Sequence, residues 1–137
     1  MTKNRICDLF AVTMLIMTIA AATTIAHAQT FSVLHNFGTK SVDLDYPGYP
    51  GIIAQGRDGN LYSTGAGGGK GSAGGVFKIT PAGTFTVLQS LDVTDGNAPQ
   101  GGLTLATDGN FYGTAELGGT NNAGVIFKIT PSGSLFV

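Results

Sequence analysis

The sequence predicts an all-β protein built from tandem four-stranded antiparallel repeats that pack as blades of a partial propeller. Two observations predict this fold. The chain has 22 glycines, all after residue 28, and such a density between short β-branched and aromatic runs opposes long helices. Residues 51–87 also match residues 101–137 at 17 of 37 positions without a gap, which indicates one supersecondary unit copied along the chain.

The first 28 residues have the pattern of a secretory signal peptide. Lys3 and Arg5 precede the apolar stretch "LFAVTMLIMTIAAATTIA", and the segment ends in Ala26-His27-Ala28. A signal peptidase recognises this order of basic end, apolar middle and small residues, so we expect cleavage after Ala28. An uncleaved membrane anchor is the alternative, because the stretch approaches the roughly 20 residues that span a bilayer.

The mature chain, residues 29–137, offers few groups for catalysis or charge-based binding. Cleavage removes Cys7 and His27, so no disulfide or thiolate ligand can form and His35 is the remaining histidine. Five lysines and arginines face seven acidic residues, and a net charge of −2 provides no electrostatic basis for nucleic acid binding. We expect no cofactor, no nucleic acid partner and no membrane attachment after cleavage.

Each repeat divides into four short strands joined by turns. The first repeat reads "GIIAQ", "LYSTG", "VFKIT" and "TFTVL", and the second reads "GLTLAT", "FYGTA", "IFKIT" and "SLFV". Asp-Gly-Asn at 58–60 and 108–110 is typical of a tight hairpin between the first two strands. A Gly-rich loop leads to the third strand, which ends at Pro-Ala-Gly or Pro-Ser-Gly. Here Pro presets the first corner of a turn and Gly accepts a left-handed one.

The third strand explains why a single sheet is not enough. In "VFKIT", Phe77 and Ile79 share one face while Val76 and Lys78 share the other, so both faces are partly apolar. Such a sheet needs a neighbour on each side, as stacked blades supply.

The segment "TFSVL" at 30–34 resembles a fourth strand, which sets the first unit at about 31–84 and the second at about 85–137. Four extra residues fall in "GTKSVDLDYPGYP", which we expect to be a loop.

Together these phrases resemble a known family. The pattern Asp-Gly-Asn-(Leu/Phe)-Tyr-x-Thr, a Gly-Gly loop, (Val/Ile)-Phe-Lys-Ile-Thr-Pro-x-Gly and then Thr-x-Thr-Val-Leu is similar to the GloVer tandem repeat of "choice-of-anchor" proteins, which are bacterial extracellular proteins. The resemblance covers residues 30–137. It implies a secreted or surface-attached repeat protein with a propeller-like fold and no established activity.

Two loops look like binding motifs but lack the required context. In "GAGGGKGS" at 65–72, Gly71 stands where a phosphate-binding loop needs Ser or Thr after Lys70. "GKGSAG" at 69–74 fits G-x-G-x-x-G but opens a strand rather than a helix, so we expect a flexible inter-strand loop. "DVTDGN" at 92–97 lacks EF-hand spacing and predicts a solvated turn, with a weak carboxylate cation site at Asp92 and Asp95 as the alternative.

Two pairs of repeated polar residues also have structural explanations. Asp58 and Asp108 occupy the same turn position, so we expect each carboxylate to cap its own turn rather than to form an acid–base pair across blades. Lys78 and Lys128 are expected to run their stems over apolar neighbours, with a salt bridge to a turn aspartate as the alternative.

Two tyrosines and a histidine raise the question of a ligand. Tyr62 and Tyr112 fit the core or a blade interface, and an exposed ladder for stacking sugars is the alternative. His35 aligns with Gln89, which supports neither metal ligation nor general-base catalysis. We therefore assign no catalytic, cofactor-binding or metal-binding residue.

The function expected from these features is that of a non-catalytic structural or binding module, secreted or at the cell envelope, with further copies of itself or cell-surface polysaccharide as partners. The alternative is a polysaccharide hydrolase or lyase, since propellers host such sites on their loops. A site would break the repeat symmetry, as do His35, the "VDLDY" insertion and Glu116. Repeat folds usually need at least about three units, so we also expect a longer gene product or an oligomer.

Overall fold

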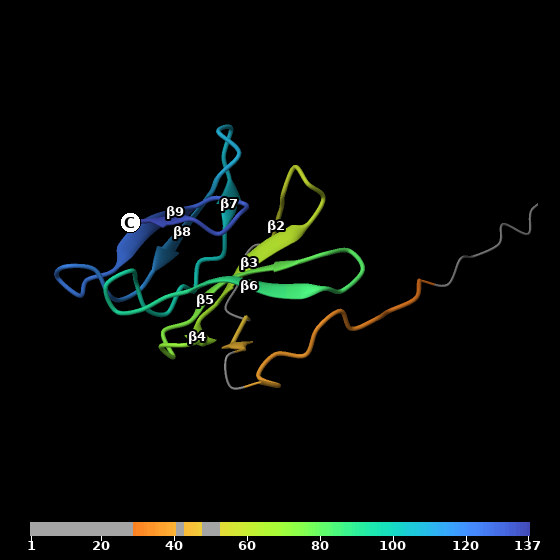
Figure 1. Ribbon diagram of the computed structural model, residues 1–137, viewed down its shortest axis with the longest axis horizontal. Helices are drawn as coiled ribbons and strands as arrows, with labels where there is room; N and C mark the ends of the chain where they lie inside the picture. The colour runs from red at the N-terminus through yellow and green to blue at the C-terminus, as the bar shows by residue number, and fades with distance from the viewer. Residues whose placement is uncertain (1–28, 41–42, 48–52) are drawn as a thin grey trace, which may run out of the picture. The chain divides into compact units, whose positions relative to one another are not determined.

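The computed structural model describes residues 29–40, 43–47 and 53–137. The expected signal peptide and parts of the inserted segment lie outside these residues. The chain divides into residues 1–32 and residues 33–137, and the second unit holds every strand named below. All regular elements in the described part are β-strands, which confirms the all-β prediction (Figure 1). The described residues contain no helix with the length and apolar character needed to cross a membrane.

Two four-stranded antiparallel sheets carry the two repeats. The first has the order β2-β3-β5-β6, and its strands are Ala54–Gln55, Leu61–Gly65, Gly75–Ile79 and Phe85–Ser90. The second has the order β7-β8-β9-β10, and its strands are Thr104–Leu105, Phe111–Ala115, Val125–Ile129 and Leu135–Phe136. The two central pairs share one register, since Leu61 faces Ile79 and Phe111 faces Ile129. The prediction of tandem four-stranded repeats is confirmed.

The turns inside each sheet have one shared geometry. The Gly56 N–H donates to the Asn60 carbonyl at 2.8 Å and the Gly59 N–H donates to the Gly56 carbonyl at 3.0 Å, with Gly59 at φ 79°. This pattern is a three-residue hairpin loop, in which a type I turn is followed by a left-handed glycine. The same bonds close the turns at 80–84, 106–110 and 130–134. Gly83 and Gly133 have φ values of 88° and 98°, as the Pro-x-Gly pattern predicts.

A third, two-stranded sheet was not expected from the sequence. Strand β1, Leu44–Asp45, lies in the inserted segment and pairs with β4, Gly67–Gly68, in the Gly-rich loop. Both segments were expected to be loops, and that expectation was wrong for these four residues. The absence of a side chain at Gly68 permits the pairing, because a Cβ there would overlap the carbonyl oxygen of Asp43. The buried Leu44 side chain then covers the flanking glycines Gly65 and Gly69.

The segment "TFSVL" at residues 30–34 forms no strand, so its prediction as a fourth strand was wrong. Its counterpart β6 pairs with β5, which precedes it in the chain and carries the phrase "VFKIT". No such phrase stands before residue 30, where the apolar N-terminal stretch lies instead. The segment therefore has a fourth strand's sequence, but the third-strand phrase that pairs with such a strand in the repeats does not precede it.

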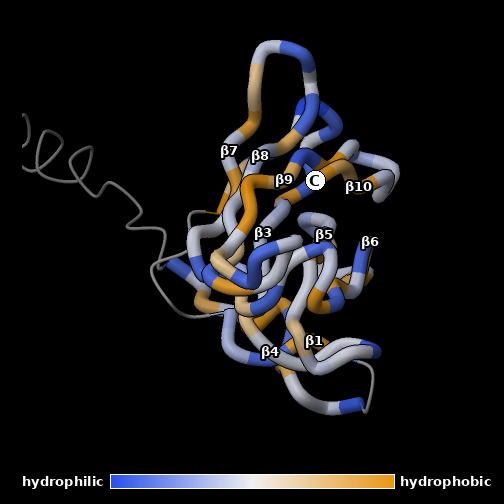
Figure 2. The backbone as a smooth tube through the Cα atoms, turned by 90° about the vertical axis from the view of Figure 1, so that its left-hand side faces the viewer, coloured by the Kyte–Doolittle hydropathy of each residue, from blue (hydrophilic) through white to orange (hydrophobic). Residues whose placement is uncertain are grey.

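The core lies between the two sheets. The Tyr62 ring stacks on the Phe111 ring, with centroids 4.2 Å apart and planes inclined by 28°. Val76 lies on the Tyr62 face of the first sheet, while Phe127 and Ile129 lie on the Phe111 face of the second, and all are buried. Figure 2 shows the matching hydropathy pattern, with apolar stretches along the strands and hydrophilic turns at their ends. Each sheet thus supplies one partly apolar face to the contact, as the third-strand pattern predicts.

Candidate functional site

The repeated aspartates each close their own turn, as predicted. Asp58 Oδ1 accepts a hydrogen bond from the Asn60 N–H at 3.2 Å, and its Oδ2 accepts from Asn60 Nδ2 at 2.6 Å and from the Tyr62 hydroxyl at 2.7 Å. Asp108 forms the same three bonds, at 3.0, 2.8 and 3.0 Å, with Asn110 and Tyr112. The tyrosine partner was not foreseen, although the repeated four-residue spacing from Asp to Tyr could have indicated it.

These bonds keep both carboxyl groups in the ionised form. The Tyr62 hydroxyl bond, followed by the bonds from Asn60, lowers the pKa of Asp58, while Asn110 is the main cause of the lowered pKa of Asp108. A general acid in sugar hydrolysis needs a raised pKa, so neither residue is suited to that role. The geometry supports turn closure and gives no support to an acid–base pair across the sheets.

Burial, and then the negative charge and hydrogen bond of Asp58, raise the pKa of Tyr62 to about 12. An unfolded tyrosine titrates near pH 10, so the folded protein holds this proton more tightly. The resulting stabilisation should be complete below about pH 10 and should disappear as the pH rises to about 12. The hydrogen bond to Asp108 raises the pKa of the exposed Tyr112 in the same direction. Tyrosinate absorbance should show a group that titrates near pH 12, which Tyr62→Phe removes and Tyr112→Phe retains. Titration of every tyrosine of the folded protein near pH 10 would contradict this prediction.

The two equivalent tyrosines lie in different environments. Tyr62 is fully buried against Phe111, which confirms the expectation of a blade-interface aromatic. The same expectation was wrong for Tyr112, whose ring is exposed because no described sheet packs on its face. Because one of the two rings is covered, they do not form an exposed ladder for sugars.

Lys128 places its Nζ 4.7 Å from the centroid of the Phe136 ring. Among the described residues, neither repeated lysine forms an ion pair with a turn aspartate.

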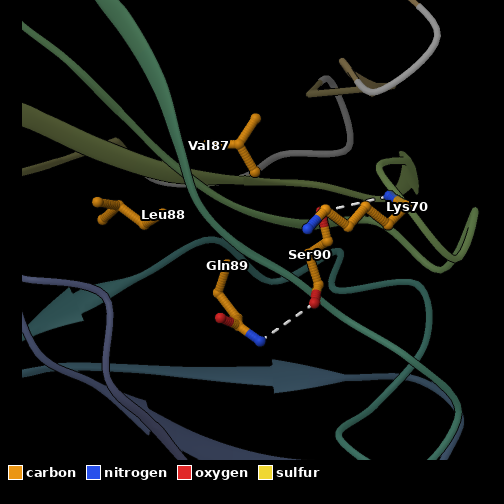
Figure 3. Close-up of a pocket in the computed structure, with 5 residues that line it drawn as sticks. All are labelled: Lys70, Val87, Leu88, Gln89 and Ser90. Atoms are coloured by element: carbon orange, nitrogen blue, oxygen red, sulfur yellow. Dashed lines mark hydrogen bonds between the residues drawn. The ribbon is translucent and has the colours of Figure 1, made fainter.

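The Gly-rich loop borders a hollow of about 310 Å³, formed with the last residues of β6 (Figure 3). The Lys70 N–H donates to Ser90 Oγ at 3.3 Å, and Gln89 Nε2 donates to the Ser90 carbonyl at 3.2 Å. The loop leads into strand β5 and not into a helix, so it lacks the helix N-terminus that dinucleotide and phosphate motifs use. The walls of the hollow are mixed, since Val87 and Leu88 lie beside Lys70, Gln89 and Ser90, and these residues form no recognised ligand-binding motif.

Asp92 forms the solvated turn that the sequence predicts. Its Oδ1 accepts hydrogen bonds from the Thr94 N–H, the Thr94 hydroxyl and the Asp95 N–H, at 2.8, 2.6 and 3.1 Å. These bonds lower the pKa of Asp92, with the Thr94 hydroxyl as the main cause, while burial and then Asp92 raise the pKa of Asp95. No cluster of three or more His, Cys, Asp or Glu side chains in the described part of the chain is placed to hold a metal ion.

The structure brings together two of the features that break the repeat symmetry. His35 Nε2 lies 3.4 Å from Asp43 Oδ2, and Asp43 belongs to the "VDLDY" insertion. The His35 ring lies flat on Phe85, with centroids 3.8 Å apart. These residues and Lys40 line a hollow of about 370 Å³. Sequence alignment of the repeats could not find this pair, because Asp43 has no counterpart in the second repeat.

Asp43 is already engaged by the backbone around it. Its Oδ1 accepts from the Leu44 N–H at 3.0 Å, and its Oδ2 accepts from the Thr39 N–H and hydroxyl at 3.4 and 3.3 Å. The carboxylate therefore ties Thr39 to Asp43 and Leu44 in addition to facing His35. Glu116, the remaining symmetry-breaking residue, accepts a hydrogen bond from Gln100 Nε2 at 2.6 Å on the exposed surface.

The two sheets share the same register and the same turn geometry, and each has its own Asp–Asn–Tyr network. These shared features define a tandem β-repeat protein with blade-like units. The family model described as the Gloeobacter/Verrucomicrobia repeat matches residues 16–137, so the chain belongs to this family. The resemblance to the GloVer repeat is thereby confirmed. No curated protein and no solved structure gives a match.

Proposed function

We propose that this repeat protein is a non-catalytic structural or binding module, secreted or held at the bacterial cell envelope. The observation that carries the proposal is the repeated Asp–Asn–Tyr network. Both aspartates bond within their own hairpins, in the same way in each copy. The residues that the chain repeats therefore build the fold, and they leave the loops and outer faces as binding surfaces.

The location rests on the N-terminal sequence. A basic end, an apolar middle and Ala26-His27-Ala28 match what a signal peptidase recognises. The chain from Gln29 onward contains no cysteine, so it needs no oxidative folding step after export. Cell-surface polysaccharide is the ligand class that we propose for the polar surfaces, since hydroxyl and amide groups such as those of the partly exposed Ser90 and Gln89 are suited to sugar hydroxyls.

The test is to express the full chain in a bacterial host, recover the exported protein and incubate it with a panel of polysaccharides. We expect binding without turnover, and an intact mass that begins at Gln29. Hydrolysis that Asp58→Asn or Asp108→Asn abolishes, with the circular dichroism spectrum unchanged, would contradict the non-catalytic proposal. An intact N-terminus on membrane-bound material would contradict the proposed location.

One observation favours a second candidate, a polysaccharide lyase. Removing a proton beside a sugar carboxylate requires a base and a neighbouring cation, and His35 and Lys40 line one hollow. The repeat supplies a matched control, because Gln89 is the counterpart of His35. Cleavage of uronic-acid polysaccharides by the unmodified protein, with formation of an unsaturated product that His35→Gln eliminates, would favour this candidate.

A further inference from the structure

Equivalent residues of the two repeats differ in burial on one face of each sheet. On the first sheet, Tyr62, Thr64 and Val76 are buried because the second sheet packs on them. Their counterparts on the second sheet lie open: Tyr112 is 38% exposed, Ile126 is 74% exposed, and Thr114 is also exposed. We call these three residues the leading face. It repeats the surface on which one sheet receives the next, and no residue of the described part of the chain covers it.

The opposite face of the first sheet shows the complementary difference. Leu103 and Phe111, which meet the first sheet, are buried, with Leu103 only 1% exposed. Their counterparts are Ile53, which is 58% exposed, and Leu61, which is partly exposed. We call the surface around Ile53 and Leu61 the trailing face.

The trailing face contains an apolar hollow of about 320 Å³. Its apolar lining comes from the first sheet and the residue before β2, and from the segment that precedes them: Ile53, Leu61, Phe77, Ile79, Leu34, Phe37 and Pro47. His35 and Ser63 add two polar side chains to the lining. A cavity of about 150 Å³ with an apolar lining is large enough to take benzene. Residues 34–37 therefore cover part of the trailing face but leave room for an aromatic ring.

We propose that the leading face of one copy of this chain docks on the trailing face of a second copy, head to tail. Tyr112 enters the hollow beside Leu61, as Tyr62 packs on Phe111 within the chain, and Ile126 becomes covered as Val76 is. The occupant is a second copy because the internal contact already joins these two kinds of face. This proposal does not depend on which ligand the module binds.

The two docking faces are different surfaces, so the contact is heterologous and can be repeated from copy to copy. It should be weaker than the internal contact. Within the chain, Arg57 Nη2 donates to the Thr107 carbonyl at 2.6 Å across the two sheets. In the second repeat, the position of Arg57 is occupied by Thr107. The threonine side chain is too short to donate a hydrogen bond across two sheets as the guanidinium of Arg57 does, so the contact between copies forms without this bond.

The test measures self-association of the purified protein, expressed from its full sequence, by sedimentation from micromolar to millimolar concentration. We expect association that weakens at least roughly tenfold in Ile126→Lys, since a charged side chain would be buried in the contact. Val93→Lys is the matched control, because Val93 is 63% exposed and lies outside both faces. Should Ile126→Lys fail to fold, Thr104→Arg on the same exposed surface replaces it.

Mixing two variants tests the direction of the contact. Ile126→Lys blocks the leading face and Ile53→Lys blocks the trailing face, so each variant alone should be a monomer. Their mixture retains one intact leading and one intact trailing face, and it should form heterodimers and nothing larger. A protein that stays monomeric at millimolar concentration, a control that weakens association as much as Ile126→Lys, or a mixture without heterodimers would each overturn the proposal.

Discussion

Replacing Tyr62 with alanine is expected to lower the free energy of unfolding by roughly 3–5 kcal/mol, the range observed when large buried aromatic side chains are truncated. Tyr62 is fully buried, stacks on Phe111 and donates to Asp58, so the change removes a core contact and a turn bond together. Apart from the loss of its hydrogen bond to Asp108, the same substitution at Tyr112 should lower the free energy of unfolding by less than about 1 kcal/mol, because that ring is exposed.

Urea unfolding followed by circular dichroism measures both variants. The comparison is informative because each tyrosine follows an Asp-Gly-Asn turn and donates a hydrogen bond to the aspartate of that turn. Equal losses of stability would mean that the turn bond dominates and that the stacking of the two sheets contributes little. A large loss confined to Tyr62→Ala would locate the stabilisation in the contact between the sheets.

Gly74→Ala is the second change from which we expect a large effect. Gly74 has φ 83°, and a Cβ there would overlap the Gly65 carbonyl oxygen and lie 2.8 Å from the carbonyl carbon of Ala66. The left-handed conformation alone costs a residue with a Cβ about 1–2 kcal/mol. Relief of the overlap requires backbone movement, which typically adds about 1–3 kcal/mol.

Gly59→Ala separates these two costs. Gly59 has nearly the same φ, 79°, but no atom lies within 4 Å of the position its Cβ would take. We expect it to lose only the conformational part, about 1–2 kcal/mol. Thermal unfolding of the two variants beside the unmodified protein provides the comparison, and equal losses would show that close packing around Gly74 is unimportant.

Local sequence predicted the parts of the fold that local chemistry determines. The Pro-x-Gly turns and the Asp58 cap follow from residues within five positions of one another, so their geometry could be read directly from the chain. The strand phrases "LYSTG" and "VFKIT" likewise carry their own alternation. The two four-stranded sheets follow from these phrases, because each strand of a repeat pairs with the next strand of the same repeat along the chain.

The remaining features depend on residues that meet from distant positions. The pairing of Leu44–Asp45 with Gly67–Gly68 requires a close approach that Gly-rich composition permits but does not specify. The contact of His35 with Asp43 joins a residue before the insertion to one inside it, and the insertion has no repeat counterpart for comparison. The different burial of Tyr62 and Tyr112 could not be read from the Asp-Gly-Asn turn and the Tyr-x-Thr pattern that they share, since the neighbouring sheet decides it.

The short hairpin loops have a consequence for the order of folding. Neighbouring strands in each sheet are joined mostly by turns or brief loops, so most pairing contacts are local and each sheet can form rapidly without the other. The Tyr62–Phe111 contact instead joins residues about fifty positions apart, and closing that larger loop of chain carries a greater entropic cost. We therefore expect the sheets to form first and to dock afterwards, with the stacking of these two rings as a late event on the folding pathway.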